Sequence, residues 1–122
     1  MNTRAIGKFG EEVAGKYLCS KGYKLLNKNW TCYGGELDIV TKSPNAMLTF
    51  VEVKYIGLFH YCTPEEMLTS KKIRHLLRTI NTYLLKNSLD PNNWRLDLVC
   101  LSRVPGRILI NHYEDVLFTN SI

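Results

Sequence analysis

Two neighbouring strand-like segments with acidic residues on one face constrain the fold more than any other feature of this sequence. The first segment is GGELDIV, residues 34–40, and the second is LTFVEVKY, residues 48–55. Because successive strand residues point to opposite sides of a sheet, Glu36, Asp38 and Val40 are expected to share one face. The charges on that face are either the wet side of a half-covered sheet or part of a site.

The second segment repeats this arrangement. Alternation places Phe50, Glu52 and Lys54 on one face. The other face then holds three apolar residues, Val51, Val53 and Tyr55. Since the intervening residues 41–46 (TKSPNA) are rich in turn formers, we expect the two segments to form an antiparallel hairpin.

The register of this hairpin decides where the acids meet. The apolar residues must share a face, and pairing Leu37 with Val53 and Ile39 with Val51 meets this demand. In that register Asp38 lies directly across from Glu52, with Cβ atoms ~4.5–5.5 Å apart. A shift of two residues keeps the faces and separates the acids diagonally. Either way, two carboxylates converge beside Lys54.

Three interpretations of the acidic pair are open. The charges could lie on a solvated face, where Lys54 neutralises one acid and water screens the rest. They could form a carboxylate pair for acid–base chemistry, although no sugar-binding cleft is evident from the sequence. They could also hold a divalent cation such as Mg²⁺, which takes carboxylate and carbonyl oxygens and relieves the repulsion between acids. The lysine could then orient or polarise a water against a phosphate.

The rest of the chain completes an α/β pattern. Periodicity predicts helices over residues 4–21 and 70–86, and Thr63 followed by Pro and Glu is typical of a helix start. Residues 56–62 are expected to form an irregular crossing loop. Three more strands are expected, at residues 23–30, 94–101 and 107–113. The predicted fold is α/β, a mixed sheet flanked by helices in the order α-β-β-β-α-β-β.

Length and composition are those of an ordinary globular chain. With 122 residues, 45% apolar and 22% charged, we expect one domain over residues 1–122. No segment reaches the ~20 apolar residues of a membrane span and the N-terminus has no apolar signal region, so we expect a cytoplasmic protein without a membrane partner. The four scattered cysteines are expected to be buried reduced thiols. The net charge of +5 leaves room for an anionic partner.

The order of the charged motifs resembles a nuclease signature. Asp38 followed by Glu52-Val53-Lys54 is similar to the PD-(D/E)XK motif without its leading Pro. The chain also resembles the YraN family of uncharacterised bacterial proteins, which is regarded as similar to archaeal Holliday-junction resolvases, in the segments GKFGEEVAGKYLCSKGYKLLNKNW, GELDIV, FVEVK, TSKK and RLDLV. The likeness extends from about residue 7 to residue 99 and implies a restriction-endonuclease-like fold.

The resemblance assigns roles to the charged cluster. Asp38 and Glu52 would be ligands of Mg²⁺ or Mn²⁺, with the backbone carbonyl of Val53 as a further ligand. Lys54 would be the catalytic lysine. Glu11 matches the acidic residue that resolvase-like nucleases add to the site from the first helix. A helical wheel places it towards the edge of the apolar stripe, from which it could reach inward.

Other positions match the family more loosely. Glu36 belongs to the family's Gly-Glu-x-Asp motif, and Glu12 is a neighbouring candidate, but both could equally be solvated glutamates. Arg95 and Asp97 match an Arg-x-Asp strand of the family. We expect Asp97 to be structural, paired with Arg95 or with another basic neighbour.

The second long helix is expected to contact nucleic acid. Lys72 matches a family lysine near the start of this helix, and residues 70–86 contain no acidic residue. The expected nucleic-acid-binding residues are Lys71, Lys72, Arg74 and Arg78. Such a run is usually a solvated face, but beside a metal site it could neutralise several phosphates.

Departures from the family pattern thin the positive charge around the site. Ile56 stands where an Arg is frequent, and Thr31 and Tyr33 stand where basic residues are frequent. With the acidic residues intact, the resemblance implies a Mg²⁺- or Mn²⁺-dependent nuclease that cleaves DNA phosphodiester bonds, with branched DNA as a candidate substrate. The alternative is a non-catalytic nucleic-acid-binding module of the same fold. A third possibility is that the basic helix binds another protein. Formation of a homodimer also stays open.

Overall fold

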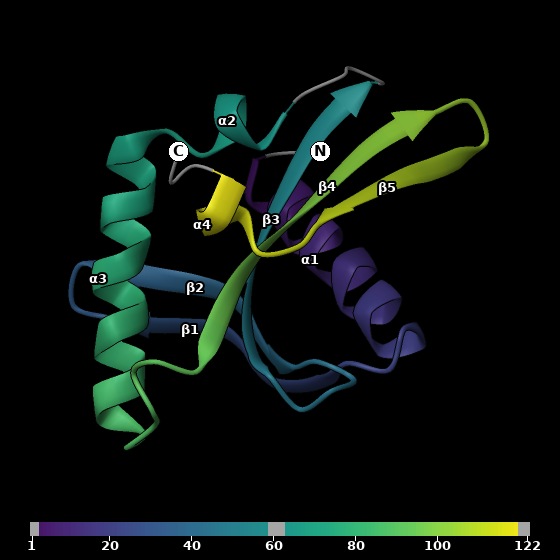
Figure 1. Cartoon of the computed structure of the whole chain (residues 1–122). Helices are drawn as coiled ribbons and strands as arrows, with labels where there is room; N and C mark the ends of the chain where they lie inside the picture. Colours follow the sequence, from purple (N-terminus) through teal and green to yellow (C-terminus); the bar gives the residue numbers. More distant parts are fainter. Residues whose placement is uncertain (1–2, 59–62, 120–122) are drawn as a thin grey trace.

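The computed structural model describes residues 3–58 and 63–119 of the chain. Its elements, in chain order, are α1 (Thr3–Ser20), β1 (Lys24–Cys32), β2 (Gly35–Lys42), β3 (Leu48–Leu58), α2 (Pro64–Met67), α3 (Ser70–Lys86), β4 (Trp94–Val104), β5 (Arg107–Tyr113) and α4 (Val116–Thr119). The strands form one sheet in the order β1-β2-β3-β4-β5, in which β3 and β4 are parallel and the other pairs are antiparallel. Helices cover both faces, with α1 on one side and α3 on the other (Figure 1).

The expected α/β class and element order are confirmed. The order α-β-β-β-α-β-β, expected for a restriction-endonuclease-like fold, holds for the long elements. α3 has the predicted bounds, residues 70–86, and Thr63 forms with Glu66 the capping box that begins α2. The short helix α4 has no counterpart in the prediction.

Three predicted strand ends are wrong, because strand pairing extends further than the local pattern indicates. β1 continues past residue 30 to Cys32, which pairs with Gly35. β3 continues to Leu58 through residues that were expected to form a crossing loop, and Leu58 pairs with Arg103 beyond an irregularity in the parallel ladder. β4 continues to Val104, where it pairs with Arg107 of β5. Residues 59–62 of the expected loop lie outside the described residues.

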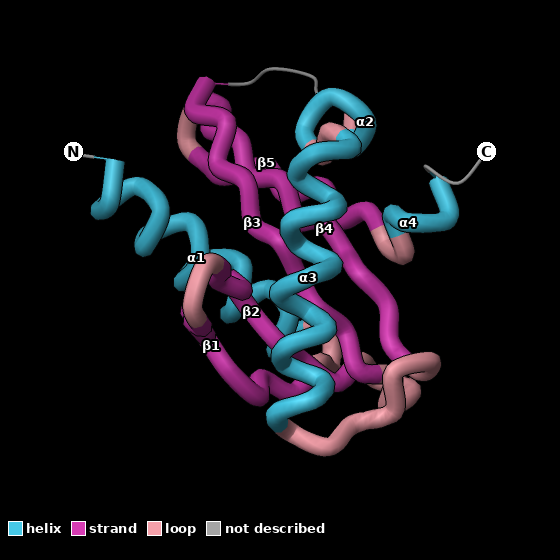
Figure 2. Tube along the Cα trace, turned by 90° about the vertical axis from the view of Figure 1, so that its left-hand side faces the viewer, coloured by secondary structure: helices cyan, strands magenta, loops and turns pink. Residues whose placement is uncertain are grey.

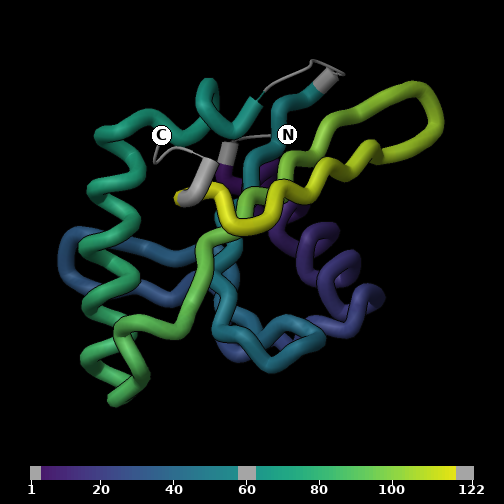
Figure 3. The backbone as a smooth tube through the Cα atoms, viewed as in Figure 1, coloured from purple at the N-terminus to yellow at the C-terminus, as the bar shows by residue number. Residues whose placement is uncertain are grey.

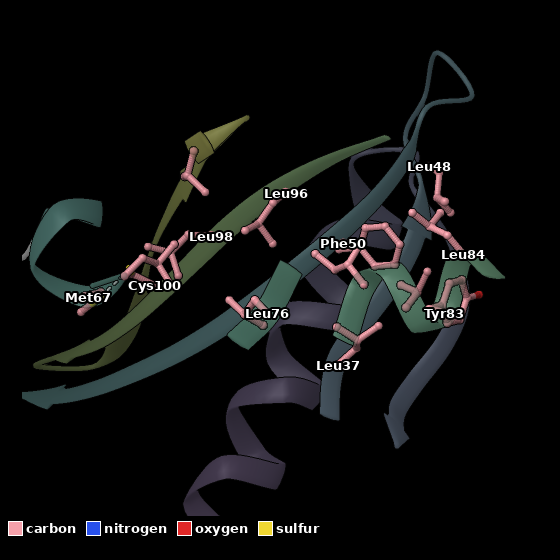
Figure 4. Packing of buried hydrophobic residues seen from close by; sticks show 14 residues of the cluster. Leu37, Leu48, Phe50, Met67, Leu76, Tyr83, Leu84, Leu96, Leu98 and Cys100 are labelled. Carbon is pink, nitrogen blue, oxygen red and sulfur yellow. Dashed lines mark hydrogen bonds between the residues drawn. The ribbon is translucent and has the colours of Figure 1, made fainter. Parts of the chain in front are cut away.

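The larger hydrophobic cluster lies between the sheet and α3. Helical spacing puts Leu76, Ile80 and Leu84 on one stripe of α3, and all three are buried. They meet Phe50 of β3, whose ring lies edge-on to Tyr83 with the ring centroids 5.5 Å apart. Figure 4 shows these side chains between the helix and the strands. The short helices α2 and α4 pack on the same face.

The second hydrophobic cluster lies under α1, on the opposite face of the sheet (Figure 2). Ala14 and Leu18 are fully buried in it, together with Ile39 of β2. At Gly10, one turn earlier, an added Cβ would lie 3.6 Å from the side chain of Leu101. Small residues on this side of α1 therefore let the helix lie directly on the sheet.

The alternation of side chains along β2 slips once. Leu37 and Val40 both pack in the α3 cluster, whereas Ile39 packs in the α1 cluster. Regular alternation would place Leu37 and Val40, three positions apart, on opposite faces. They share a face because Asp38 and Ile39, which lie between them, are both on the other face. The expectation that Asp38 and Val40 share a face is therefore wrong. The slip lies across from Asn29 of β1, which has a left-handed φ of +52° and so interrupts the regular pleat there.

Two expectations concern the thiols and the membrane. Among the described residues, Cys100 is buried, Cys32 is half-buried and Cys19 is exposed. The prediction of burial is thus right for Cys100 and wrong for Cys19, which lies near the exposed end of α1, while Cys62 lies outside the described residues. In the described ranges no helix combines the length and the apolarity needed to cross a lipid bilayer.

Candidate functional site

The ladder between β2 and β3 ends in the middle of both strands. Its last pair is Ile39 with Val51, which is one of the two expected registers and excludes the two-residue shift. The expected pair of Leu37 with Val53 is wrong, because the ladder stops before it and the two side chains pack on opposite faces. One step further, the Oδ2 atom of Asp38 accepts a hydrogen bond from the backbone N–H of Val53 at 2.9 Å. A side-chain carboxylate thus takes the N–H that a backbone carbonyl would accept in a continued ladder. This contact orients Asp38 towards β3.

α1 contributes a further acid to the same place. Carboxylate oxygens of Glu11, Glu36 and Asp38, one from each residue, lie within 4.8 Å of one another. Glu36 and Asp38 share a face of β2, as strand alternation predicts, and the slip in β2 keeps Asp38 on the side of α1. Glu11 reaches them because the small residues of α1 set this helix close to the sheet. The structure therefore brings Glu11 together with Asp38, as expected.

Glu52 and Lys54 approach Asp38 from β3. The Nζ atom of Lys54 lies 3.9 Å from the Oε2 atom of Glu52, and their side chains are 34% and 17% exposed. Glu52 also shares a hydrogen bond with the Asp38 carboxylate. Lys54, Glu52 and Asp38 thus converge where β2 and β3 part. The carbonyl of Val53 stays a predicted ligand, since the contact that the structure shows for this residue is made by its N–H.

The electrostatics of this acidic cluster oppose full ionisation. The pKa of Glu52 is raised to about 9, chiefly by burial and further by the charge and hydrogen bonding of Asp38, while Lys54 opposes the rise. Burial also raises the pKa of Glu11, as does the charge of Asp38, whereas a hydrogen bond from Asn29 lowers it. Crowded carboxylates therefore retain a proton in the metal-free protein near neutral pH.

Two neighbours of Glu11 were not predicted from the sequence. Asn29 donates the hydrogen bond to Glu11, and the charge of Lys28 lowers the pKa of the same carboxyl. Both belong to β1, two strands away from Glu52. The available signal was the Asn at position 29, since Asn is among the few residues that adopt a left-handed φ readily, but no local pattern connects this position to α1.

The basic helix lies on the face of the sheet away from Glu11. The four expected nucleic-acid-binding residues are all exposed there: Lys71, Lys72, Arg74 and Arg78. Lys72 has its Nζ atom 3.4 Å from the carbonyl of Met67, so it also holds the end of α2. Arg78 contacts Nδ1 of His75 at 3.4 Å. The structure does not bring these cations beside Glu11.

A second polar cluster surrounds Asp97. This carboxylate is fully buried and accepts hydrogen bonds from Arg95 at 3.0 Å and from the backbone N–H of Asp115 at 3.0 Å, and its Oδ2 atom lies 2.8 Å from Nε2 of His112. Oxygens and nitrogens of Asp97, His112 and Glu114 are close enough together to hold a metal ion. Because protein donors already engage both Asp97 oxygens, the cluster is structural, with the expected Arg95 pairing. It joins β4 and β5 to the segment before α4.

The chain matches the uncharacterised protein family UPF0102 over residues 10–101. It belongs to this family. This confirms the resemblance to the YraN family, and the matched span contains every residue of the acidic cluster. A UPF0102 protein of Carboxydothermus hydrogenoformans is 37% identical over 96% of this chain and 98% of its own length. The UPF0102 protein FP2501 of Flavobacterium psychrophilum is 33% identical over 93% of each chain.

A solved structure is similar to this chain at a greater distance. It is that of Pyrococcus furiosus SfsA in complex with Ca²⁺, with a TM-score of 0.37 and 17% identity. The likeness covers 93% of this chain and 64% of the SfsA chain.

Proposed function

We propose that this member of UPF0102 is a divalent-cation-dependent nuclease that cleaves DNA phosphodiester bonds. The observation that carries the proposal is the convergence of Asp38, Glu52 and Lys54 with Glu11 at the point where β2 and β3 part. Three carboxylates and one ammonium group, from two strands and a helix, are a charge arrangement that the hydrophobic core does not require.

The donor set fits Mg²⁺ or Mn²⁺. These hard cations take carboxylate oxygens, and those of Glu11, Glu36 and Asp38 already lie within 4.8 Å of one another. The pKa of Glu52, raised to about 9 by burial and by Asp38, supports the same conclusion, because a cation would relieve the repulsion that now holds a proton there. When bound, the ion would supply Lewis-acid polarisation of a phosphoryl oxygen and neutralise developing charge.

Residues of the chain would orient the ligands, position a water and stabilise the developing charge. The Val53 N–H holds the Asp38 carboxylate in one orientation, so its oxygens need no reorganisation when substrate arrives. Lys54, held near Glu52, would position a water by hydrogen bonding and stabilise negative charge that develops on the phosphate. Glu11 would complete the oxygen ligand set from α1.

The test is Lys54→Ala, with Lys86→Ala at the exposed end of α3 as a lysine control. Single-turnover cleavage of branched and linear DNA with Mn²⁺ is expected to fall by ~10²–10³ in the first variant, the usual loss for one preorganised stabiliser, and to be unchanged in the second. DNA binding measured in Ca²⁺ should persist in both. If the wild type binds DNA but cuts no substrate with any divalent metal, the non-catalytic binding module replaces the nuclease.

A further inference from the structure

The turn between β1 and β2 presents an aromatic ring to solvent. Cys32 pairs with Gly35, which leaves Tyr33 and Gly34 as a two-residue turn, and Gly34 takes the φ of +81° that closes it. The side chain of Tyr33 is fully exposed. An exposed ring at a hairpin tip adds nothing to the core, so it is available to a ligand.

Tyr33 borders a cleft between the hairpin and α3. The cleft has a volume of about 410 Å³, within the range of small-ligand sites. Its lining residues are Cys32, Tyr33, Gly34, His75, Arg78, Thr79 and Thr82. The hairpin, blue in Figure 3, reaches past α3 at this point. Gly35 packs so closely against Thr79 that an added Cβ would lie 3.0 Å from its Cγ2 atom, which fixes the hairpin on the helix.

The charge around the cleft favours an anionic occupant. Lys71, Arg74 and Arg78 are exposed and recur on one stripe of α3, a helix without a single acidic residue. In residues 3–58 and 63–119, the ion pairs involve none of these three cations. Arg78 both lines the cleft and carries a charge that no acid of the described chain neutralises. A planar ring and a guanidinium group thus flank one small cleft.

We propose that Tyr33 and Arg78 bind one unpaired nucleotide of a DNA strand, with the base stacked on the ring and the phosphate on the guanidinium. Stacking on a protein aromatic requires a base with an exposed face, and a duplex covers both faces of its internal bases. The cleft therefore selects single-stranded segments, as found in branched or frayed DNA, over continuous duplex.

This inference rests on the proposed function and names its substrate class. Glu36 of the acidic cluster follows Tyr33 by three residues, so no more than ~11 Å of extended chain separates their backbones. A nucleotide held at the turn would place the adjoining part of its strand within a few nucleotides of the acidic cluster. The site would then cut next to the junction between paired and unpaired DNA.

The test uses Tyr33→Ala and Tyr33→Phe in Ca²⁺, where binding is measured without cleavage. Fluorescence anisotropy is recorded for a labelled single-stranded oligonucleotide, for the same strand with one abasic position at each site in turn, and for a blunt duplex. Tyr33→Ala is expected to weaken single-strand binding roughly 5- to 100-fold, the usual loss for one base–aromatic stack, and to leave duplex binding within about twofold. Tyr33→Phe should bind as the wild type does. One abasic position should weaken binding to the wild type and have no effect on Tyr33→Ala.

Arg78→Ala supplies the phosphate half of the test. It should lower the slope of log K against log salt by ~0.7 on the single strand, the value for one contact. The proposal is overturned if Tyr33→Ala changes nothing, if it weakens single-strand and duplex binding equally, or if Tyr33→Phe is as weak as Tyr33→Ala. It also falls if Tyr33→Ala alters the sedimentation of the protein, since the turn would then be a contact between copies. Wild-type binding without cleavage would leave this result standing and remove only the nuclease activity.

Discussion

Glu52 couples the acidic cluster to folding stability through its proton. Its pKa is about 9 in the folded protein, against an ordinary value of 4.5, because of burial and the neighbouring Asp38. Between these two values the folded state holds a proton that the unfolded state has lost. The stability that Glu52 contributes is therefore fully present below about pH 4.5 and is lost as the pH rises through 9.

We predict that Glu52→Gln removes this pH dependence. Without metal, the wild type should lose stability between pH 5 and 9 with a slope of at most about 1.4 kcal/mol per pH unit, which is the limit for one proton. The variant should lack this slope and be more stable than the wild type at pH 8, because an amide carries no charge to bury. Urea unfolding in the presence of a chelator measures both.

Glu12→Gln is the matched control for this prediction, since Glu12 is exposed on α1 beside the cluster. It should reproduce the wild-type slope. Parallel pH profiles for the wild type and Glu52→Gln would contradict the assignment of the proton to Glu52.

At the scale of elements, the position of the β1–β2 hairpin depends on one glycine. Gly35 lies against Thr79 of α3, where an added Cβ would be 3.0 Å from Cγ2 and closer still to Oγ1. Thr79 is buried, and its hydroxyl donates to the carbonyl of His75, so it cannot turn away without losing that bond. This contact sets the separation of hairpin and helix.

We predict that Gly35→Ala destabilises the protein by roughly 1–3 kcal/mol, the usual cost of overpacking, because the hairpin must move off α3. Gly7→Ala is the control: no atom lies within 4 Å of a Cβ built at Gly7 in α1, so this change should stabilise by about 0.5–1 kcal/mol through helix propensity. Denaturant unfolding compares the two. Equal effects would show that the contact with Thr79 does not limit the packing.

At the scale of the whole molecule, the acidic cluster receives side chains from both faces of the sheet. Glu11 reaches the acidic cluster from α1, whereas Glu52 and Lys54 share the face of β3 on which Phe50 packs towards α3.

We predict that replacing Lys71, Arg74 and Arg78 together by Ala flattens the salt dependence of duplex binding. Each lost phosphate contact should lower the log–log slope by ~0.9. Lys72 is left in place because its Nζ atom also contacts the Met67 carbonyl. The measurement is DNA binding in Ca²⁺ over a range of salt concentrations.

The charge-matched control for this variant replaces three exposed lysines elsewhere by Ala: Lys8, Lys16 and Lys24. It should keep the wild-type slope. An unchanged slope in the α3 variant, or an equal loss in the control, would mean that the duplex contacts another face.

Much of the architecture followed from local pattern. The stripe of α3, its bounds and the capping box at Thr63 were predictable, because helix periodicity and capping depend on residues within one or two turns. The hairpin register at Ile39 and Val51 was one of the two registers that the apolar faces allow, so the sequence narrowed the choice and the structure decided it. From these came the approach of Asp38 to Glu52 and Lys54.

Tertiary structure decided what local pattern could not express. The slip at Asp38 and Ile39 breaks the period of two on which strand predictions rest, and it is tied to a left-handed residue on another strand, Asn29. β3 and β4 extend beyond the strands that their sequence patterns predict, because pairing between strands supplies hydrogen bonds that side-chain alternation does not reveal. The motifs on β2 and β3 could be recognised in the sequence because one hairpin joins the two strands. The place of Glu11 beside Asp38 was expected only from the family resemblance. The proton on Glu52 could not be predicted, since burial and Coulomb interactions depend on which distant segments pack together.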